Sequence, residues 1–161
     1  MPNYRRSYQP GGCWFFTVNL QNRRSDLLVQ QFKLLSQSLH HTQTAKPFKM
    51  LAWVVLPEHL HTIWRLPATD SDYASRWQLL KLTFSRELHK NTGQSTGHQG
   101  KIWQRGYWEH LIRNDADFKN HFDYVHRNPL KHQLVRQVQD WPLSSFHHYV
   151  KRGIYPPDWC G

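Results

Sequence analysis

The order in which two apolar patterns alternate along the chain is the feature that most constrains its fold. Segments rich in aromatic and β-branched residues indicate strands, whereas apolar residues spaced three and four apart indicate amphipathic helices. Strands are expected at residues 13–20, 48–56, 59–66 and within 102–113. Helices are expected from Ser25 onward, along the stripe from Tyr73 to Leu88, and from Asn114 or Asp115 to about Asn128.

This order predicts the fold class. The elements follow in the order strand, helix, strand, strand, helix, strand, helix. This order favours an α+β domain in which a mostly antiparallel, ferredoxin-like sheet carries helices on one face. Pro129 should end or kink the last helix at Asn128. Residues 91–100 contain three glycines and no apolar side chain, and predict a mobile loop. The length of 161 residues suits one domain, 1–161, with an irregular tail from about 141 to 161.

The charge of the chain indicates a polyanionic partner. There are 21 lysines and arginines against 11 acidic residues, a formal charge of +10. Such an excess attracts nucleic acid or an anionic membrane surface. Aromatic residues, 14% of the chain and often beside basic ones, favour nucleic acid through base stacking. Without a membrane-length apolar run or a C-x-x-C pair, the sequence predicts a cytoplasmic protein that does not bind membranes.

Two pairs of residues could carry chemistry. His59 and His61 are two apart in an expected strand, so both imidazoles share one face and could hold a divalent ion. The alternative is an ordinary packed pair, since 12 histidines in 161 residues make about one His-x-His expected by chance. Tyr124 and Asn128 are four apart on the flank of the last helix and could face a cleft. Their alternatives are a core aromatic with a wet hydroxyl and a helix-end residue before proline.

Three motifs in order resemble a known family. Residues 57–61 (PEHLH) resemble the His-hydrophobic-His element of the HUH superfamily, and residues 124–129 (YVHRNP) resemble the tyrosine helix of its single-tyrosine transposases. Between them, residues 103–110 (WQRGYWEH) resemble a segment typical of the REP-associated branch. The chain is therefore similar, from about Tyr4 to Tyr149, to the REP-associated tyrosine transposases, which are IS200-like.

The resemblance implies a fold of the HUH type and a set of roles. His59 and His61 correspond to ligands of Mg²⁺ or Mn²⁺, and Tyr124 to the nucleophile. Asn128 corresponds to a third ligand, where related insertion-sequence transposases commonly have Gln. The implied activity is cleavage of single-stranded DNA beside REP-type hairpins, giving a 5′-phosphotyrosine and a free 3′-hydroxyl that allow rejoining. A monomer is expected, with a tyrosine-exchanging dimer as the alternative, acting in the bacterial cytoplasm at the nucleoid.

Further residues are expected to contact the DNA. Stacking on bases is assigned to Trp103, Tyr107 and Trp108. Solvated surface charge is the alternative for each basic side chain, and should account for about half of them. The candidates for phosphate contacts are Arg5, Arg6, Arg23, Arg24, Arg105, Arg127 and Lys131.

Other readings of the sequence stay open. The chain could be a hairpin-binding protein that no longer cuts, or a metal-dependent nuclease that acts through water. If Tyr124 is the nucleophile, it needs a nearby cation or base, because tyrosine ionises near pH 10 in water. The sequence identifies no such group.

Overall fold

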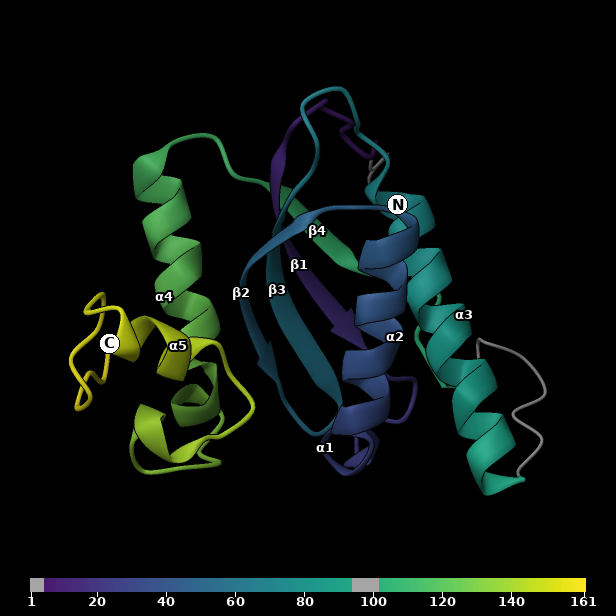
Figure 1. The fold of residues 1–161 in the computed structure, drawn as a ribbon. Coiled ribbons are helices and arrows are strands. Elements are labelled where there is room, and N and C mark those ends of the chain that lie inside the picture. Colours follow the sequence, from purple (N-terminus) through teal and green to yellow (C-terminus); the bar gives the residue numbers. More distant parts are fainter. Residues whose placement is uncertain (1–4, 94–101) are drawn as a thin grey trace.

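A four-stranded sheet with the strand order β2-β3-β1-β4 forms the centre of the fold (Figure 1). The computed structural model describes residues 5–93 and 102–161. Every neighbouring pair of strands is antiparallel, which confirms the predicted α+β class. The strands are β1 (Cys13–Asn19), β2 (Lys49–Val55), β3 (His59–Arg65) and β4 (Trp108–Leu111). The helices are α1 (Leu27–Gln30), α2 (Phe32–Ala45), α3 (Tyr73–Thr92), α4 (Asp115–Lys131), the 3-10 helix η2 (Val138–Asp140) and α5 (Phe146–Lys151).

The two central strands, β1 and β3, bury apolar side chains on both faces. Trp14 and Phe16 of β1 belong to the core beneath α2 and α3, whereas Phe15 between them belongs to the core beneath α4. On β3, Trp64 belongs to the core beneath α2 and α3, and Ile63 belongs to the core beneath α4. Because successive side chains of a strand point to opposite faces, such strands need a cover on each side.

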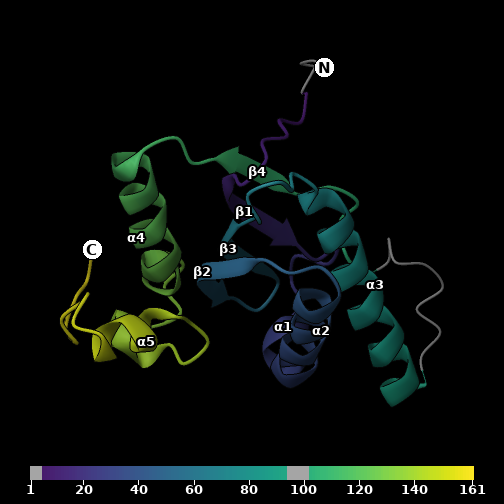
Figure 2. The ribbon, with the colours of Figure 1, turned by 45° about the horizontal axis from the view of Figure 1, so that its top comes forward.

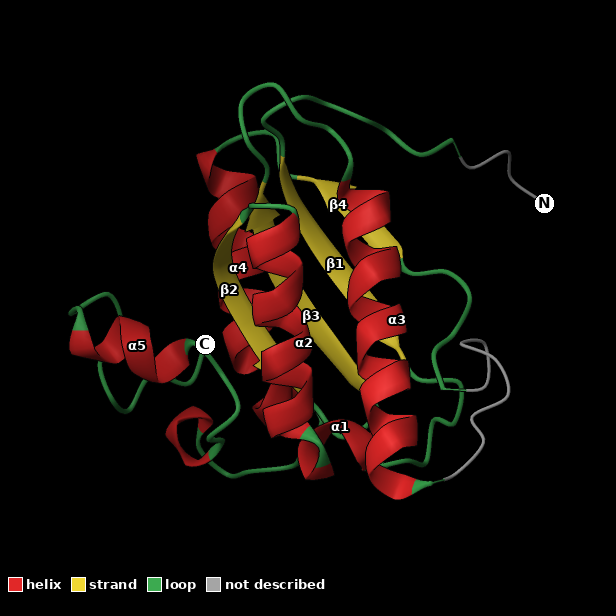
Figure 3. Cartoon of the chain, turned by 45° about the vertical axis from the view of Figure 1, so that its right-hand side comes forward, coloured by secondary structure: helices red, strands yellow, loops and turns green. Residues whose placement is uncertain are grey.

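Helices accordingly cover both faces of the sheet, and the expectation that they lie on one face is wrong for α4. The helices α2 and α3 pack together on one side, while α4 packs against β2 and β3 on the other, as Figures 2 and 3 show from two directions. The cause lies in β1 and β3, where Phe15 and Ile63 form a second core with Phe122 and Val125 of α4.

Helix ends differ from the expected ones in two places. The helix expected from Ser25 is two helices, α1 and α2, that meet at Gln31. The last helix, α4, continues through Pro129 to Lys131 instead of ending at Asn128. Because Pro129 lies in the last turn, its missing N–H removes a single backbone hydrogen bond. The chain beyond is held by a bond from the His132 amide to the Asn128 carbonyl.

Two expected irregular segments are partly helical. The helix α3 runs to Thr92 and is capped by Gly93 at a φ of 66°, so the expected loop at 91–100 begins later. Its residues 94–100 lie outside the described part of the chain. The tail expected to be irregular contains α5, and its Phe146 and Tyr155 pack in the α4 core. Within residues 5–93 and 102–161, no helix is both long and apolar enough to cross a membrane.

Candidate active site

His59 and His61 lie side by side on β3, facing α4. They are 4% and 3% exposed, and their ring centroids are 5.0 Å apart. Each ring has its Nδ1 occupied: His59 Nδ1 lies 2.7 Å from Glu58 Oε1, and His61 Nδ1 lies 2.8 Å from Thr17 Oγ1. These contacts fix the ring orientations and leave the Nε2 atoms for another ligand. Among the described residues, the buried Nε2 of His61 has no hydrogen-bond partner.

Both imidazoles are neutral at pH 7. Burial lowers the pKa of His61, and the neighbouring His59 and His132 add to the effect, so that this pKa falls to about 3. Burial also lowers the pKa of His59, although the Glu58 carboxylate opposes the shift. A neutral imidazole is the form that binds a metal ion. The pair is therefore ready to ligate without first losing protons.

Asn128 of α4 lies next to the His61 ring. Its amide opposes the lowering of the His61 pKa, although the two side chains do not reach hydrogen-bond geometry. The Asn128 Nδ2 donates to the Tyr124 carbonyl at 3.3 Å, whereas its buried Oδ1 has no partner within the described residues. A buried carbonyl oxygen without a donor is costly, and it suits a hard cation.

Tyr124, one helical turn before Asn128, lies at the open edge of this group. Its side chain is 37% exposed, and its ring centroid lies 5.3 Å from that of His61 at an interplanar angle of 71°. The Lys131 ammonium donates to the Tyr124 hydroxyl at 3.2 Å and lies 4.6 Å from the ring centroid. The structure therefore places the tyrosine hydroxyl beside a cation and the tyrosine ring next to His61.

Four contributions to the site escaped the sequence analysis. Glu58 belongs to the PEHLH motif, but the sequence analysis gave it no role. Thr17 lies opposite His61 because of the register in which β1 pairs with β3. His132, whose ring centroid is 5.1 Å from that of His59, follows a helix that was expected to end earlier. Lys131 was assigned to phosphates, and its contact with Tyr124 could have been noticed from the helical spacing of seven residues.

The expected DNA contacts near Tyr124 are few. Arg127 and Lys131 are exposed and line one pocket with Tyr124. Arg23 is half-exposed and reaches back to Asn19 and to Glu58, whose Oε1 accepts from Arg23 Nη2 at 3.4 Å. Arg23 and Lys131 lie close enough to the histidine pair for their charges to lower the pKa of His59 and of His61, respectively.

Other expected contacts lie elsewhere. Arg6, Arg105 and Tyr107 line a pocket with Lys81, and the Arg6 guanidinium sits 4.2 Å from the Tyr107 ring centroid. The expected stacking role of Trp103 is wrong, because this side chain is 1% exposed in the core. Three further candidates are exposed: Arg5, Arg24 and Trp108.

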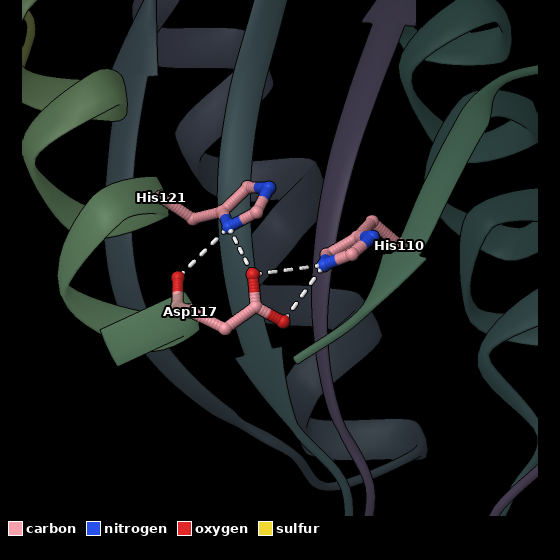
Figure 4. Close-up of side chains that lie close together, drawn as sticks. All are labelled: His110, Asp117 and His121. Carbon is pink, nitrogen blue, oxygen red and sulfur yellow. Dashed lines mark hydrogen bonds and ion pairs between the residues drawn. The ribbon is translucent and has the colours of Figure 1, made fainter. Parts of the chain in front are cut away.

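A second group of ligand-type side chains lies near the site. His110 of β4 and Asp117 and His121 of α4 bring their ligand atoms within 4.8 Å of one another (Figure 4). Among the described residues, these three side chains form a close group of histidine and acidic ligands that could hold a metal ion. The sequence analysis did not single it out.

Comparisons with known families, sequences and structures all point to one family. The profile of the family described as "Transposase IS200 like" matches residues 12–128. The REP-associated tyrosine transposase of Escherichia coli K12 is 50% identical, over 100% of this chain and 92% of that protein. A relative from Haemophilus influenzae is 44% identical, over 100% of this chain and 94% of that protein. A solved structure of the REP-associated tyrosine transposase bound to a REP hairpin superposes with a TM-score of 0.91 at 49% identity, covering 100% of this chain and 92% of that one.

Proposed function

Because this chain belongs to the IS200-like transposase family, and within it to the REP-associated tyrosine transposases, we propose that it cuts and rejoins single-stranded DNA at REP-type hairpins. The similar solved protein is bound to a REP hairpin. The charge of +10 supplies long-range attraction to the phosphates of such a strand. We place the protein at the bacterial nucleoid, where these hairpins would be met.

His59, His61 and Asn128 are assigned to a divalent ion, Mg²⁺ or Mn²⁺. The donors fit, because His61 Nε2 and Asn128 Oδ1 are buried and have no hydrogen-bond partner in the described part of the chain, and one ion would satisfy both. The neutral state of the His61 imidazole suits metal binding as well. When bound, such an ion would stabilise negative charge on the phosphate oxygens during displacement at phosphorus.

Tyr124 is assigned as the nucleophile. Its hydroxyl oxygen attacks phosphorus in line, so a P–O bond to Tyr124 forms while the bond to the 3′ oxygen breaks. The leaving oxygen takes up a proton and becomes a 3′-hydroxyl, and the 5′ end stays on the protein as a phosphotyrosine. Lys131, 3.2 Å from the hydroxyl, holds this oxygen and stabilises its charge as the proton leaves. Attack by a 3′-hydroxyl on the phosphotyrosine reverses the step and rejoins DNA.

The contact between Tyr124 and His61 carries the proposal. Their ring centroids are 5.3 Å apart within one chain, so a single copy of the protein brings the proposed nucleophile beside a proposed ligand. This arrangement supports a monomer as the active unit and makes a tyrosine-exchanging dimer unnecessary for cleavage.

Incubation with labelled single-stranded hairpin DNA and Mn²⁺, followed by denaturing electrophoresis, tests the proposal. The wild-type protein should form a covalent adduct and Tyr124→Phe should form none, while hairpin binding is retained. Tyr124→Phe removes one oxygen from a partly exposed side chain, so the free energy of unfolding should change by less than about 0.5 kcal/mol.

Each alternative gives its own result in this assay. Binding without any cleavage by the wild type would indicate a hairpin-binding protein. Cleavage that survives in Tyr124→Phe would indicate a nuclease that acts through water. Full cleavage by the wild type in EDTA would contradict the metal role, as would full cleavage by His59→Ala.

A further inference from the structure

The side chains of His110, Asp117 and His121 surround one small volume between β4 and α4. His110 Nε2 lies 2.9 Å from Asp117 Oδ2, and His121 Nδ1 lies 3.1 Å from Asp117 Oδ1. The two imidazole rings are stacked, with centroids 4.4 Å apart. Figure 4 shows both rings directed at the same carboxylate. Two histidines from consecutive elements, β4 and α4, thus share a single acidic partner.

These separations are close to those of ligands around one ion. Ligand atoms about 2.0 to 2.1 Å from a tetrahedral zinc ion are roughly 3.3 Å from one another. Small movements of the side chains would therefore let an ion replace the hydrogen bonds. His121 Nδ1 would give up its 2.9 Å contact with the Asp117 carbonyl and carry its proton on Nε2 instead.

The surroundings allow an ion to enter. The side chains of His110, His121 and Asp117 are 26%, 24% and 15% exposed, so the group opens to solvent. A competing charge is the Arg113 guanidinium, whose Nε lies 3.9 Å from Asp117 Oδ2 on a side chain that is 73% exposed and can turn away. The Arg113 amide, which donates to the same oxygen at 3.1 Å, holds the carboxylate in place.

We propose that His110, Asp117 and His121 form a second metal site that takes a zinc-class ion and ties β4 to α4. Two imidazoles and a carboxylate suit Zn²⁺ better than Mg²⁺, and three protein ligands leave a fourth position for water. The site lies beside the candidate active site without sharing a ligand with it. Phe15 stands between them, with its ring centroid 4.9 Å from that of His121 and 5.6 Å from that of His61.

The position gives the ion a structural role. Asp117 and His121 occupy the first two turns of α4, and Tyr124 follows His121 by one turn. An ion that joins these turns to His110 fixes the half of α4 that leads to the tyrosine. Because it binds the folded chain, it should also raise the midpoint of thermal unfolding.

Calorimetric titration with Zn²⁺ alone tests the second site, after removal of metal with EDTA. The background is His61→Ala, which removes a ligand of the candidate active site, so the result does not depend on DNA cleavage. This variant should bind one Zn²⁺ per chain. His61→Ala with His41→Ala, which lacks an exposed histidine of α2, should bind it equally well. His61→Ala with His110→Ala should bind none, while its far-ultraviolet circular dichroism stays unchanged.

Two results would overturn the second site: no Zn²⁺ uptake by His61→Ala, or uptake that persists undiminished when His110 is also replaced. If His110→Ala does not fold, His121→Gln takes its place, since its side chain is partly exposed and its loss leaves the sheet intact. Zn²⁺ should also raise the unfolding midpoint of His61→Ala but not of His61→Ala combined with His121→Gln.

Discussion

The reactivity proposed for Tyr124 depends on the groups that contact its hydroxyl oxygen. The Lys131 ammonium is 3.2 Å from that oxygen, and it belongs to a side chain that the sequence suggested only as a phosphate contact. A charge placed there stabilises the oxygen as it loses its proton, and it acts most strongly when a bound DNA strand excludes water. We therefore propose that Lys131 acts in the chemical step more than in DNA binding.

Replacement of Lys131 by alanine should slow adduct formation at saturating hairpin DNA by about 100-fold, the order expected when a donor to a developing negative charge is lost. Hairpin affinity should change much less. Lys119→Ala is the matched control, since Lys119 lies on the same helix, pairs with Asp123 and is 75% exposed. Single-turnover rates of the two variants decide the matter: equal rates would refute the role of Lys131.

At the scale of the elements, the pairing of β1 with β3 decides how His61 is held. Thr17 lies directly opposite His61 in the antiparallel register, and its hydroxyl is 2.8 Å from the ring. A shift of one residue would turn Thr17 to the other face of the sheet. The ring orientation of a proposed metal ligand thus depends on strand pairing as well as on its own strand.

Thr17→Val, which keeps the shape of the side chain and removes its hydroxyl, should weaken Mn²⁺ binding at the candidate active site by about 10- to 100-fold. Electron paramagnetic resonance of free Mn²⁺ measures this directly. Thr44→Val provides the comparison, because Thr44 is exposed on α2 and bonds only to the His40 carbonyl among the contacts described. Unchanged affinity in Thr17→Val would show that its hydroxyl does not orient His61.

The elements also show what the sequence could predict. Periodicity placed His59 and His61 on one face of a strand, and Tyr124 with Asn128 on one flank of a helix, because both depend on local geometry alone. The side of the sheet that α4 covers depends on contacts between Phe15, Ile63 and the helix, which are distant in sequence. His132 was missed for a related reason, since the helix was expected to end before it.

For the whole molecule, the buried neutral histidines make stability depend on pH. Burial lowers the pKa of His61 to about 3 and that of His126 to about 4. In the unfolded chain both should ionise near pH 6.5, so below that pH the unfolded state binds more protons. Their contribution to stability is complete above pH 6.5, and it is lost as the pH falls toward 4.

Urea unfolding without added metal should show this loss between pH 7.5 and 5. Each histidine should lower the free energy of unfolding by up to about 1.4 kcal/mol per pH unit below 6.5. His126→Gln should have a shallower pH dependence than the wild type, whereas His41→Ala, an exposed histidine, should match the wild type. If His126→Gln is as sensitive to pH as the wild type, the assignment of a neutral buried His126 is wrong.

The strand β3 is hydrogen bonded along both edges, to β1 and to β2. By contrast, no backbone hydrogen bond among the described residues joins α4 to either β2 or β3. The two halves of the candidate active site therefore differ in mechanical freedom. The histidines lie on a strand whose backbone is hydrogen bonded on both sides, whereas Tyr124 lies on a helix that packs against the sheet through side chains. If Tyr124 carries a DNA end as proposed, a tilt of α4 would move that end relative to the histidines without breaking a backbone hydrogen bond of the sheet.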